Sequence, residues 1–143
     1  MQHDLLQIID ANLNRSREGL RVCEDIARFV IKDKSIAVSL KSIRHSALNA
    51  LISSGKLSLE TLLQNRRTDK DKVKFIDFKI KPKSAISDIF MSNIQRTKES
   101  LRVLEECSKI IDEKISREYR KLRFNTYDME KRAIKKIRAL SGS

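Results

Sequence analysis

Residues 11–30 read ANLNRSREGLRVCEDIARFV, and residues 92–111 read SNIQRTKESLRVLEECSKII. The two segments lie 81 positions apart and are identical at seven of twenty positions. The identical pairs are Asn12/Asn93, Arg15/Arg96, Glu18/Glu99, Leu20/Leu101, Arg21/Arg102, Val22/Val103 and Glu24/Glu105. Side-chain packing does not by itself select particular asparagines and arginines on a helix surface. The repeat therefore predicts a pseudo-two-fold pair of helices whose polar residues jointly face a partner.

The apolar residues of the chain recur with a helical period over most of its length. We predict helices over about 4–31, 35–53, 58–65, 84–112 and 116–140. The apolar stripes include Val30 in the first helix and Leu140 in the last. Ser35, Ser58 and a serine near residue 84 are the expected N-caps, and Gly55 is the expected stop of the second helix.

These helices group into two hairpins, with repeat one at about 4–54 and repeat two at about 84–140. Two helical hairpins form a four-helix bundle, so the predicted fold is all-α, with residues 1–143 as a single helical domain. The connection over about 55–83 contains a short helix followed by a run that alternates polar and apolar residues. We predict a long irregular loop there, because such connections inside compact domains are often functional.

Composition restricts the classes of function. The formal charge is +12 over 143 residues, and much of the excess falls between Lys114 and Arg138, so an anionic partner is expected. No apolar stretch is long enough to span a membrane, and the N-terminus does not read as a signal peptide. Cys23 and Cys107 match no zinc or redox spacing. We therefore expect a cytoplasmic protein that does not bind membranes.

The repeated polar residues follow every third position, from Asn12 to Glu24 and from Asn93 to Glu105. One interpretation is surface ion pairing, Arg15 with Glu18 and Arg21 with Glu24, which contributes about 0.2–0.5 kcal/mol per pair. For the whole set, repeated intact, we favour a binding site. Arginine forks bind phosphate at two points, carboxylates bind Mg²⁺, and amides can read the edge of a heterocycle. The set is typical of a site for a phosphorylated, ring-containing ligand with a metal.

Other candidates give weaker signals. His45 follows Arg44 on the second predicted helix, and Arg67 and Asp71 lie in the connection, where they are able to close over a phosphate. The sequence contains no glycine-rich phosphate loop. A nucleotide would therefore need arginines and a metal rather than backbone amides.

Five segments carry a resemblance to a known family: IIDANLNRSREGLRVCEDIARFV (8–30), LKSIRH (40–45), NRRTDKD (65–71), MSNIQRTKESLRVLEECSK (91–109) and LRFNTYDMEK (122–131). They resemble the helical hydroxymethylpyrimidine phosphate kinases of thiamine biosynthesis, which occur alone or fused to the N-terminus of thiamine-phosphate synthase. The resemblance covers nearly the whole chain. It implies ATP-dependent phosphorylation of hydroxymethylpyrimidine phosphate to the diphosphate, with Mg²⁺. The chain shows no pattern of the α/β barrel that performs the synthase reaction.

The resemblance also implies a set of site residues. We expect Arg15 and Arg96 to bind phosphate oxygens, and Glu18 and Glu99 to hold Mg²⁺ or the acceptor. Asn12 and Asn93 are expected at the pyrimidine. The remaining expected substrate contacts are Arg21, Arg102, Arg44, His45, Arg67, Asp71 and Arg123.

Two other functions stay open at this point. A basic helical module that binds nucleic acid would suit the charge, but the seven aromatic residues show no stacking pattern and the glutamates argue against it. A non-catalytic helical partner domain of a thiamine-phosphate synthase system would bind the ligand without turnover. A homodimer is a further option.

Overall fold

The structure is a computed structural model, and it describes residues 2–66 and 85–140. Every regular element in these ranges is helical, which confirms the predicted all-α class. The elements are α1 (Gln2–Ile26), the π-helical turn η1 (Ala27–Ile31), α2 (Lys34–Ile52), α3 (Leu59–Gln64), α4 (Ile86–Ser108) and α5 (Glu113–Leu140). No described helix is both long and apolar enough to cross a membrane.

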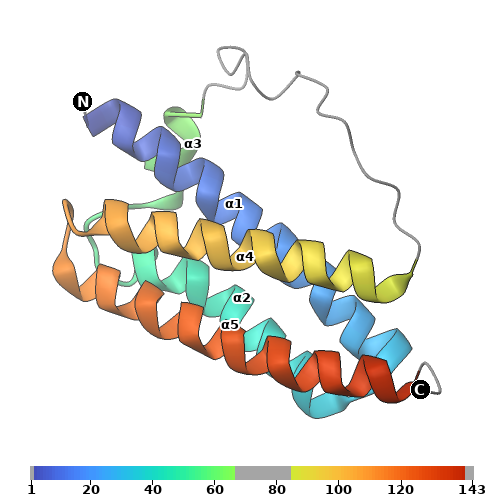
Figure 1. Cartoon of the computed structure of the whole chain (residues 1–143). Helices are drawn as coiled ribbons and strands as arrows, with labels where there is room; N and C mark the ends of the chain where they lie inside the picture. Colours follow the sequence, from blue (N-terminus) through green and yellow to red (C-terminus); the bar gives the residue numbers. More distant parts are fainter. Residues whose placement is uncertain (1, 67–84, 141–143) are drawn as a thin grey trace.

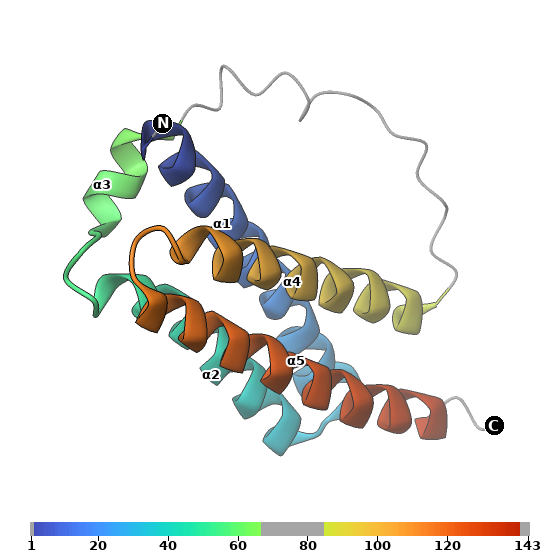
Figure 2. The ribbon, with the colours of Figure 1, turned by 60° about the vertical axis from the view of Figure 1, so that its left-hand side comes forward.

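The four long helices form an antiparallel bundle, with α3 beside the N-terminal part of α1 (Figure 1). In that view α1 and α5 run from left to right, and α2 and α4 run from right to left. Each long helix therefore packs against two antiparallel neighbours: α1 and α5 both contact α2 and α4, as the turned view also shows (Figure 2). The largest fully buried apolar side chains are Ile9, Leu20, Ile36, Leu40, Leu51, Leu62, Phe90, Ile94, Leu101, Leu104 and Tyr119.

The Tyr119 hydroxyl fixes α5 against α2 inside this core. It donates to the backbone oxygen of Ala47 at 2.6 Å, and its ring is fully buried. Burial raises the pKa of Tyr119 far above its ordinary value, because the phenolate would lose its hydration. The residue therefore remains a neutral hydrogen-bond donor that sets how the two hairpins pack.

Two predicted N-caps are wrong. The cap of α2 is Asp33 rather than Ser35, because the Asp33 carboxylate accepts from the backbone N–H of Ile36 at 3.0 Å. Ser35 lies within the first turn, and its hydroxyl accepts from Arg132 at 3.0 Å. Helix α4 begins after Ala85, which makes no side-chain cap. The predicted cap at Ser58 is confirmed, since its hydroxyl accepts from the backbone N–H of Thr61.

The predicted apolar stripes fail at two ends. Val30 is 41% exposed, because the wider π-helical turn η1 shifts the helical phase and buries Ile31 instead. The turn closes at Lys32, whose φ of 57° is left-handed. Leu140 is 59% exposed, because it is the last residue of α5 and lies beyond the final core residue, Ile137.

Candidate functional site

Helices α1 and α4 cross at small, buried residues. A Cβ atom built on Gly19 would lie 2.5 Å from Thr97 Oγ1 and 2.9 Å from the backbone oxygen of Asn93, so only glycine fits there. Ser16, Thr97 and Ser100 are also buried at this crossing. Their small side chains let the two backbones approach closely, which brings the polar borders of α1 and α4 together.

A groove of about 380 Å³ runs along this contact. We call it the α1–α4 groove, and its lining residues are Asn12, Arg15, Arg96, Glu99, Ser100 and Val103. Four of the six are residues that the sequence predicted for the site: Asn12 and Arg15 from α1, and Arg96 and Glu99 from α4. Both arginines are exposed. Two guanidinium groups from opposite helices therefore face one hollow, where they can bind phosphate oxygens.

The two asparagines make the same hydrogen bond. Asn12 donates from Nδ2 to the backbone oxygen of Ile8, and Asn93 donates from Nδ2 to that of Ile89, each at 2.8 Å. This bond uses one amide hydrogen and fixes the orientation of the side chain. The amide oxygen and the second hydrogen are not used by it, so each asparagine presents both an acceptor and a donor. Such a pair suits the edge of a nitrogen heterocycle.

Glu99 is the carboxylate of the groove. It accepts from Gln95 Nε2 at 3.3 Å and lies on the same wall as Arg96. Proteins commonly hold Mg²⁺ through one or two carboxylates together with phosphate oxygens of the substrate, and Glu99 fits that donor set. Glu18, its counterpart on α1, is exposed and outside the groove lining. Within residues 2–66 and 85–140, no three His, Cys, Asp or Glu side chains are placed to hold a metal ion.

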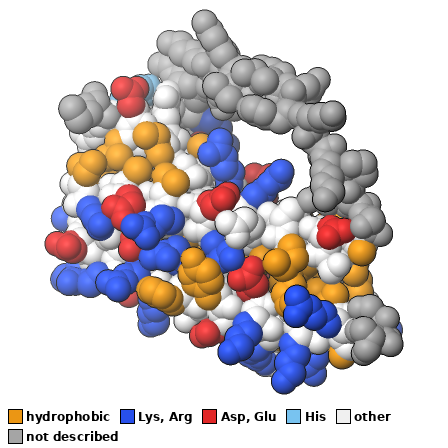
Figure 3. Space-filling view, in the orientation of Figure 1, with side chains coloured by type: hydrophobic (Ala, Val, Ile, Leu, Met, Phe, Trp, Pro, Cys, Tyr) orange, Lys and Arg blue, Asp and Glu red, His pale blue; other side chains and the backbone are white. Residues whose placement is uncertain are grey.

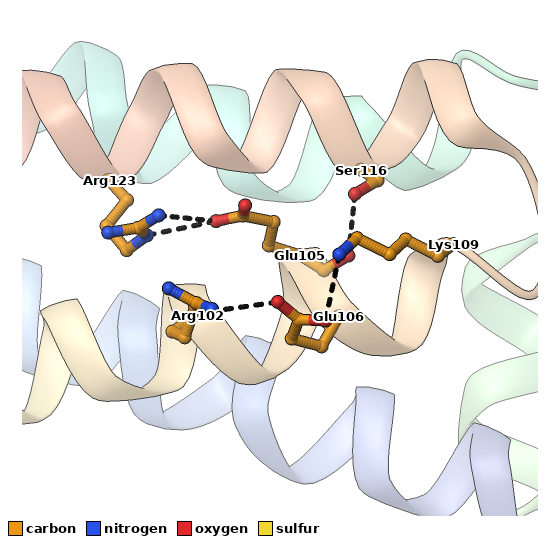
Figure 4. A network of polar contacts seen from close by, with 6 residues as sticks. All are labelled: Arg102, Glu105, Glu106, Lys109, Ser116 and Arg123. Atoms are coloured by element: carbon orange, nitrogen blue, oxygen red, sulfur yellow. Dashed lines mark hydrogen bonds and ion pairs between the residues drawn. The ribbon is translucent and has the colours of Figure 1, made fainter.

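The last glutamates of the two repeated motifs, Glu24 and Glu105, lie outside the groove lining and form ion pairs. Glu24 is almost fully buried and accepts from Arg44 Nε at 3.0 Å. Glu105 is buried likewise and accepts from Arg123 Nε at 2.9 Å (Figure 4). Three residues of an α-helix turn through about 300°, which is about 60° short of a full turn. Over the four steps from Asn12 to Glu24, the side chains therefore shift by about 240° in total around the helix axis. The last members of each repeated motif, Glu24 and Glu105, therefore lie on another side of their helices than Asn12 and Asn93.

The other predicted contacts lie outside the groove lining. Arg21 pairs with Asp25 at 3.3 Å, rather than with Glu24, and Arg102 pairs with Glu106 at 3.0 Å. Both arginines are more than half exposed. His45 is exposed on α2, whereas the groove is lined from α1 and α4. Arg67 and Asp71 fall outside the described residues.

Sequence reasoning missed several residues around the site. Ser100 and Val103 line the groove, and Gly19 sets the approach of its walls. The sequence did contain an indication of these residues, because small residues align with each other in the two repeats: Gly19 with Ser100 and Ser16 with Thr97. Asp10 was also missed: its buried carboxylate accepts both from Arg66 Nε and from Arg66 Nη2 at 2.8 Å. This pair of hydrogen bonds connects the segment after α3 to α1.

Charge is distributed unevenly over the face that carries the crossing. In Figure 3, basic and acidic side chains lie side by side over the crossing of α1 and α4, and basic side chains crowd the lower edge over α5. Acidic side chains therefore accompany the basic ones at the crossing itself, and the positive excess on this face lies over α5.

Comparison with known proteins identifies the family. The sequence profile of the ThiD2 family matches residues 7–132. The chain belongs to the ThiD2 family. It is 35% identical over 130 residues to a thiamine-phosphate synthase of Prochlorococcus marinus, covering 90% of this chain and 35% of that protein. For thiamine-phosphate synthases of Thermosynechococcus vestitus and Nostoc punctiforme the identities are 32% over 127 residues and 30% over 131 residues.

The ThiD2 match includes all six residues of the α1–α4 groove and both buried glutamate–arginine pairs. The alignments with the two latter synthases cover 88% and 91% of this chain, but 34% and 35% of the relatives. The chain thus spans about a third of the length of the curated relatives it matches. No solved structure matches it.

Proposed function

We propose that this chain is a phosphotransferase of thiamine biosynthesis that uses ATP to convert hydroxymethylpyrimidine phosphate into the diphosphate. Membership of the ThiD2 family and homology to thiamine-phosphate synthases support the thiamine-biosynthetic part. The kinase part rests on one observation: Arg15 and Arg96 converge on a groove that also presents Asn12 and Glu99.

Phosphoryl transfer to a phosphate acceptor requires little covalent chemistry from the protein. An oxygen of the acceptor phosphate forms a bond to the γ-phosphorus of ATP, and the bond from that phosphorus to the β,γ-bridging oxygen breaks. ADP leaves with the electron pair. The acceptor carries its own negative charge, since the second phosphate pKa is about 6, so no general base is needed. Catalysis then depends on positioning and charge neutralisation.

The residues of the groove supply these two contributions. Arg15 and Arg96 bind and orient the phosphates from opposite sides, and their fixed positive charges offset the repulsion between donor and acceptor. Asn12 orients the ring. Mg²⁺, when bound with ATP, neutralises phosphate charge, and Glu99 would hold it.

Purified chain, ATP, Mg²⁺ and hydroxymethylpyrimidine phosphate test the proposal, with ADP release and diphosphate formation as readouts. We expect Arg15→Ala and Arg96→Ala each to lower kcat/KM about a hundredfold or more, because each removes a donor that stabilises the transferring group. Both side chains are exposed, so we expect the variants to fold normally.

Arg21→Ala and Arg102→Ala are matched controls. They remove the other two arginines of the same repeated motif, which pair with Asp25 and Glu106 outside the groove lining. We expect near-normal kcat/KM for both. The proposal is wrong if the folded wild-type chain turns over no monophosphate, or if all four arginine variants behave alike.

A further inference from the structure

The sequence repeat provides a second set of residues of the same chemistry as the lining of the α1–α4 groove. Each lining residue of the groove has a counterpart 81 positions away in the other repeat. Arg15 and Arg96 are counterparts of each other, so this pair belongs to both sets. We call the remaining lining residues the Asn12 side: Asn12, Glu99, Ser100 and Val103. Their counterparts form the Asn93 side: Asn93, Glu18, Gly19 and Val22.

The antiparallel crossing places the Asn93 side on the same face as the Asn12 side. Gly19 lies against Asn93 and Thr97, and further along Cys23 reaches the backbone oxygen of Phe90 at 3.7 Å. Towards the other end, Asn12 shares the groove with Val103. The helices therefore run past each other with Arg15 and Arg96 between two equivalent ends. Glu18 is exposed and Asn93 is half-buried, so the second end is accessible.

The two ends offer the same kind of recognition. Each asparagine is held by an identical bond to the carbonyl four residues earlier, which leaves its amide oxygen and one hydrogen for a ligand. Each end also carries one glutamate and one valine. A duplicated site of this kind suits two ligands that share a ring edge and a phosphate.

The substrates of the proposed reaction, on which this inference rests, share both features. Hydroxymethylpyrimidine and adenine each contain an aminopyrimidine ring, with an amino donor beside a ring-nitrogen acceptor. An asparagine amide matches that edge with its own acceptor and donor. Both ligands also carry phosphate, which arginine binds at two points.

We propose that the groove binds both substrates at once, with the pyrimidine at Asn12, the adenine at Asn93, and the two phosphate groups meeting between Arg15 and Arg96. The assignment of the two ends follows from their burial. Asn12 is 6% exposed and borders the groove, which suits the smaller ligand. Asn93 is half-buried and so more accessible, which suits the longer nucleotide.

Calorimetry tests simultaneous binding. The wild-type chain is first saturated with hydroxymethylpyrimidine phosphate and Mg²⁺, and is then titrated with a non-hydrolysable ATP analogue. We expect the analogue to bind with one site per chain and an affinity at least equal to that without the pyrimidine. Competition between the two ligands would overturn the inference, since it would place them at one end of the groove.

Two matched variants test the assignment of the ends. Asn12→Ala should raise the Kd of the pyrimidine phosphate roughly tenfold, which corresponds to the loss of about one to two hydrogen bonds, and leave that of the ATP analogue within about twofold. Asn93→Ala should do the reverse. Thermal unfolding of both variants checks that the helices remain intact. Weaker binding of the same ligand by both variants contradicts the assignment.

The outcome separates this inference from the proposed function. A ternary complex that forms with the ATP analogue, followed by no diphosphate formation with ATP itself, would retain the two-ended groove and reject the kinase. Turnover in a chain whose Asn12→Ala and Asn93→Ala variants weaken binding of the same ligand would retain the kinase and reject the two-ended groove. Absence of binding by either ligand would reject both.

Discussion

Arg15 and Arg96 face one groove, whereas Arg44 and Arg123 are held by buried carboxylates, although the sequence analysis expected all four to contact the substrate. The repeated motif was sufficient to predict the first pair. The second pair could not be assigned, because its role depends on the burial of Glu24 and Glu105. That burial follows from the angular drift of a three-residue step, which carries both glutamates to the hairpin interface.

Replacing Arg44 should therefore affect stability rather than catalysis. We expect Arg44→Met to lower the free energy of unfolding by about 3 kcal/mol, because it leaves the Glu24 carboxylate buried without its main partner. The double variant Arg44→Met/Glu24→Leu should recover most of that loss. Urea unfolding measures both. If Arg44→Met unfolds like the wild type but loses turnover, Arg44 binds substrate instead.

The two cysteines should differ in reactivity. Burial raises the pKa of Cys23 to about 12, with a smaller contribution from the nearby charge of Glu130, whereas Cys107 is half-buried. Only about one Cys23 in ten thousand would be thiolate at pH 8, and the thiolate is the reactive form. Native alkylation should label Cys107 slowly and Cys23 only after unfolding, as mass spectrometry of the peptides will show. Rapid native labelling of Cys23 would mean that α1 and α4 separate readily.

The helices themselves were largely predictable, and their ends were less so. Apolar periodicity predicted the four long α-helices of residues 2–66 and 85–140, because each buries one continuous stripe, and the Ser58 cap indicated the short α3. The predicted helix ends differ from the observed ones where a neighbouring residue caps the helix instead or where the helix geometry changes locally. Asp33 precedes Ser35 and caps α2 first, and η1 inserts a wider turn that no periodic pattern encodes. Apolar periodicity and cap preferences alone do not determine which residue caps a helix or where a π-helical turn forms.

Lys32 offers a test of the η1 turn. It holds a left-handed backbone conformation that costs a side-chain-bearing residue about 1–2 kcal/mol relative to glycine. We expect Lys32→Gly to raise the free energy of unfolding by roughly 1 kcal/mol, the net gain after the greater flexibility of glycine in the unfolded chain. Lys34→Gly, in the first turn of α2, is the control and should be destabilising. Urea midpoints will measure both, and a loss of stability in Lys32→Gly would contradict the turn geometry.

The crossing of α1 and α4 gives a second test. Gly19→Ala should lower the free energy of unfolding by about 1–3 kcal/mol, because the new methyl group meets Thr97 and the Asn93 carbonyl. It should also raise KM, since separation of the helices moves Arg15 away from Arg96. Adding Thr97→Ala should restore part of both. Chemical unfolding and steady-state kinetics measure the effects, and a Gly19→Ala variant with wild-type behaviour would contradict the close approach.

The net charge of the whole molecule was evident from composition, and its concentration between Lys114 and Arg138 indicated that the last helix carries much of it. The packing of these side chains was not evident from the sequence. Basic side chains crowd α5, where Arg120 and Arg123 lie 5.8 and 5.1 Å from the centre of the exposed Phe124 ring. This ring is thus already covered by cations of its own helix. A nucleic-acid role would instead predict sequence-independent binding that weakens steeply with salt. The groove offers a more specific destination for an anion, because it combines arginines with asparagine and glutamate.

The most direct test follows the reaction of the wild-type chain by phosphorus NMR, with ATP, Mg²⁺ and either hydroxymethylpyrimidine phosphate or unphosphorylated hydroxymethylpyrimidine. We predict that a new diphosphate and ADP appear together with the monophosphate, and that the unphosphorylated ring gives no product. A folded chain that binds the monophosphate and yet forms no diphosphate would contradict the kinase and leave a ligand-binding helical domain.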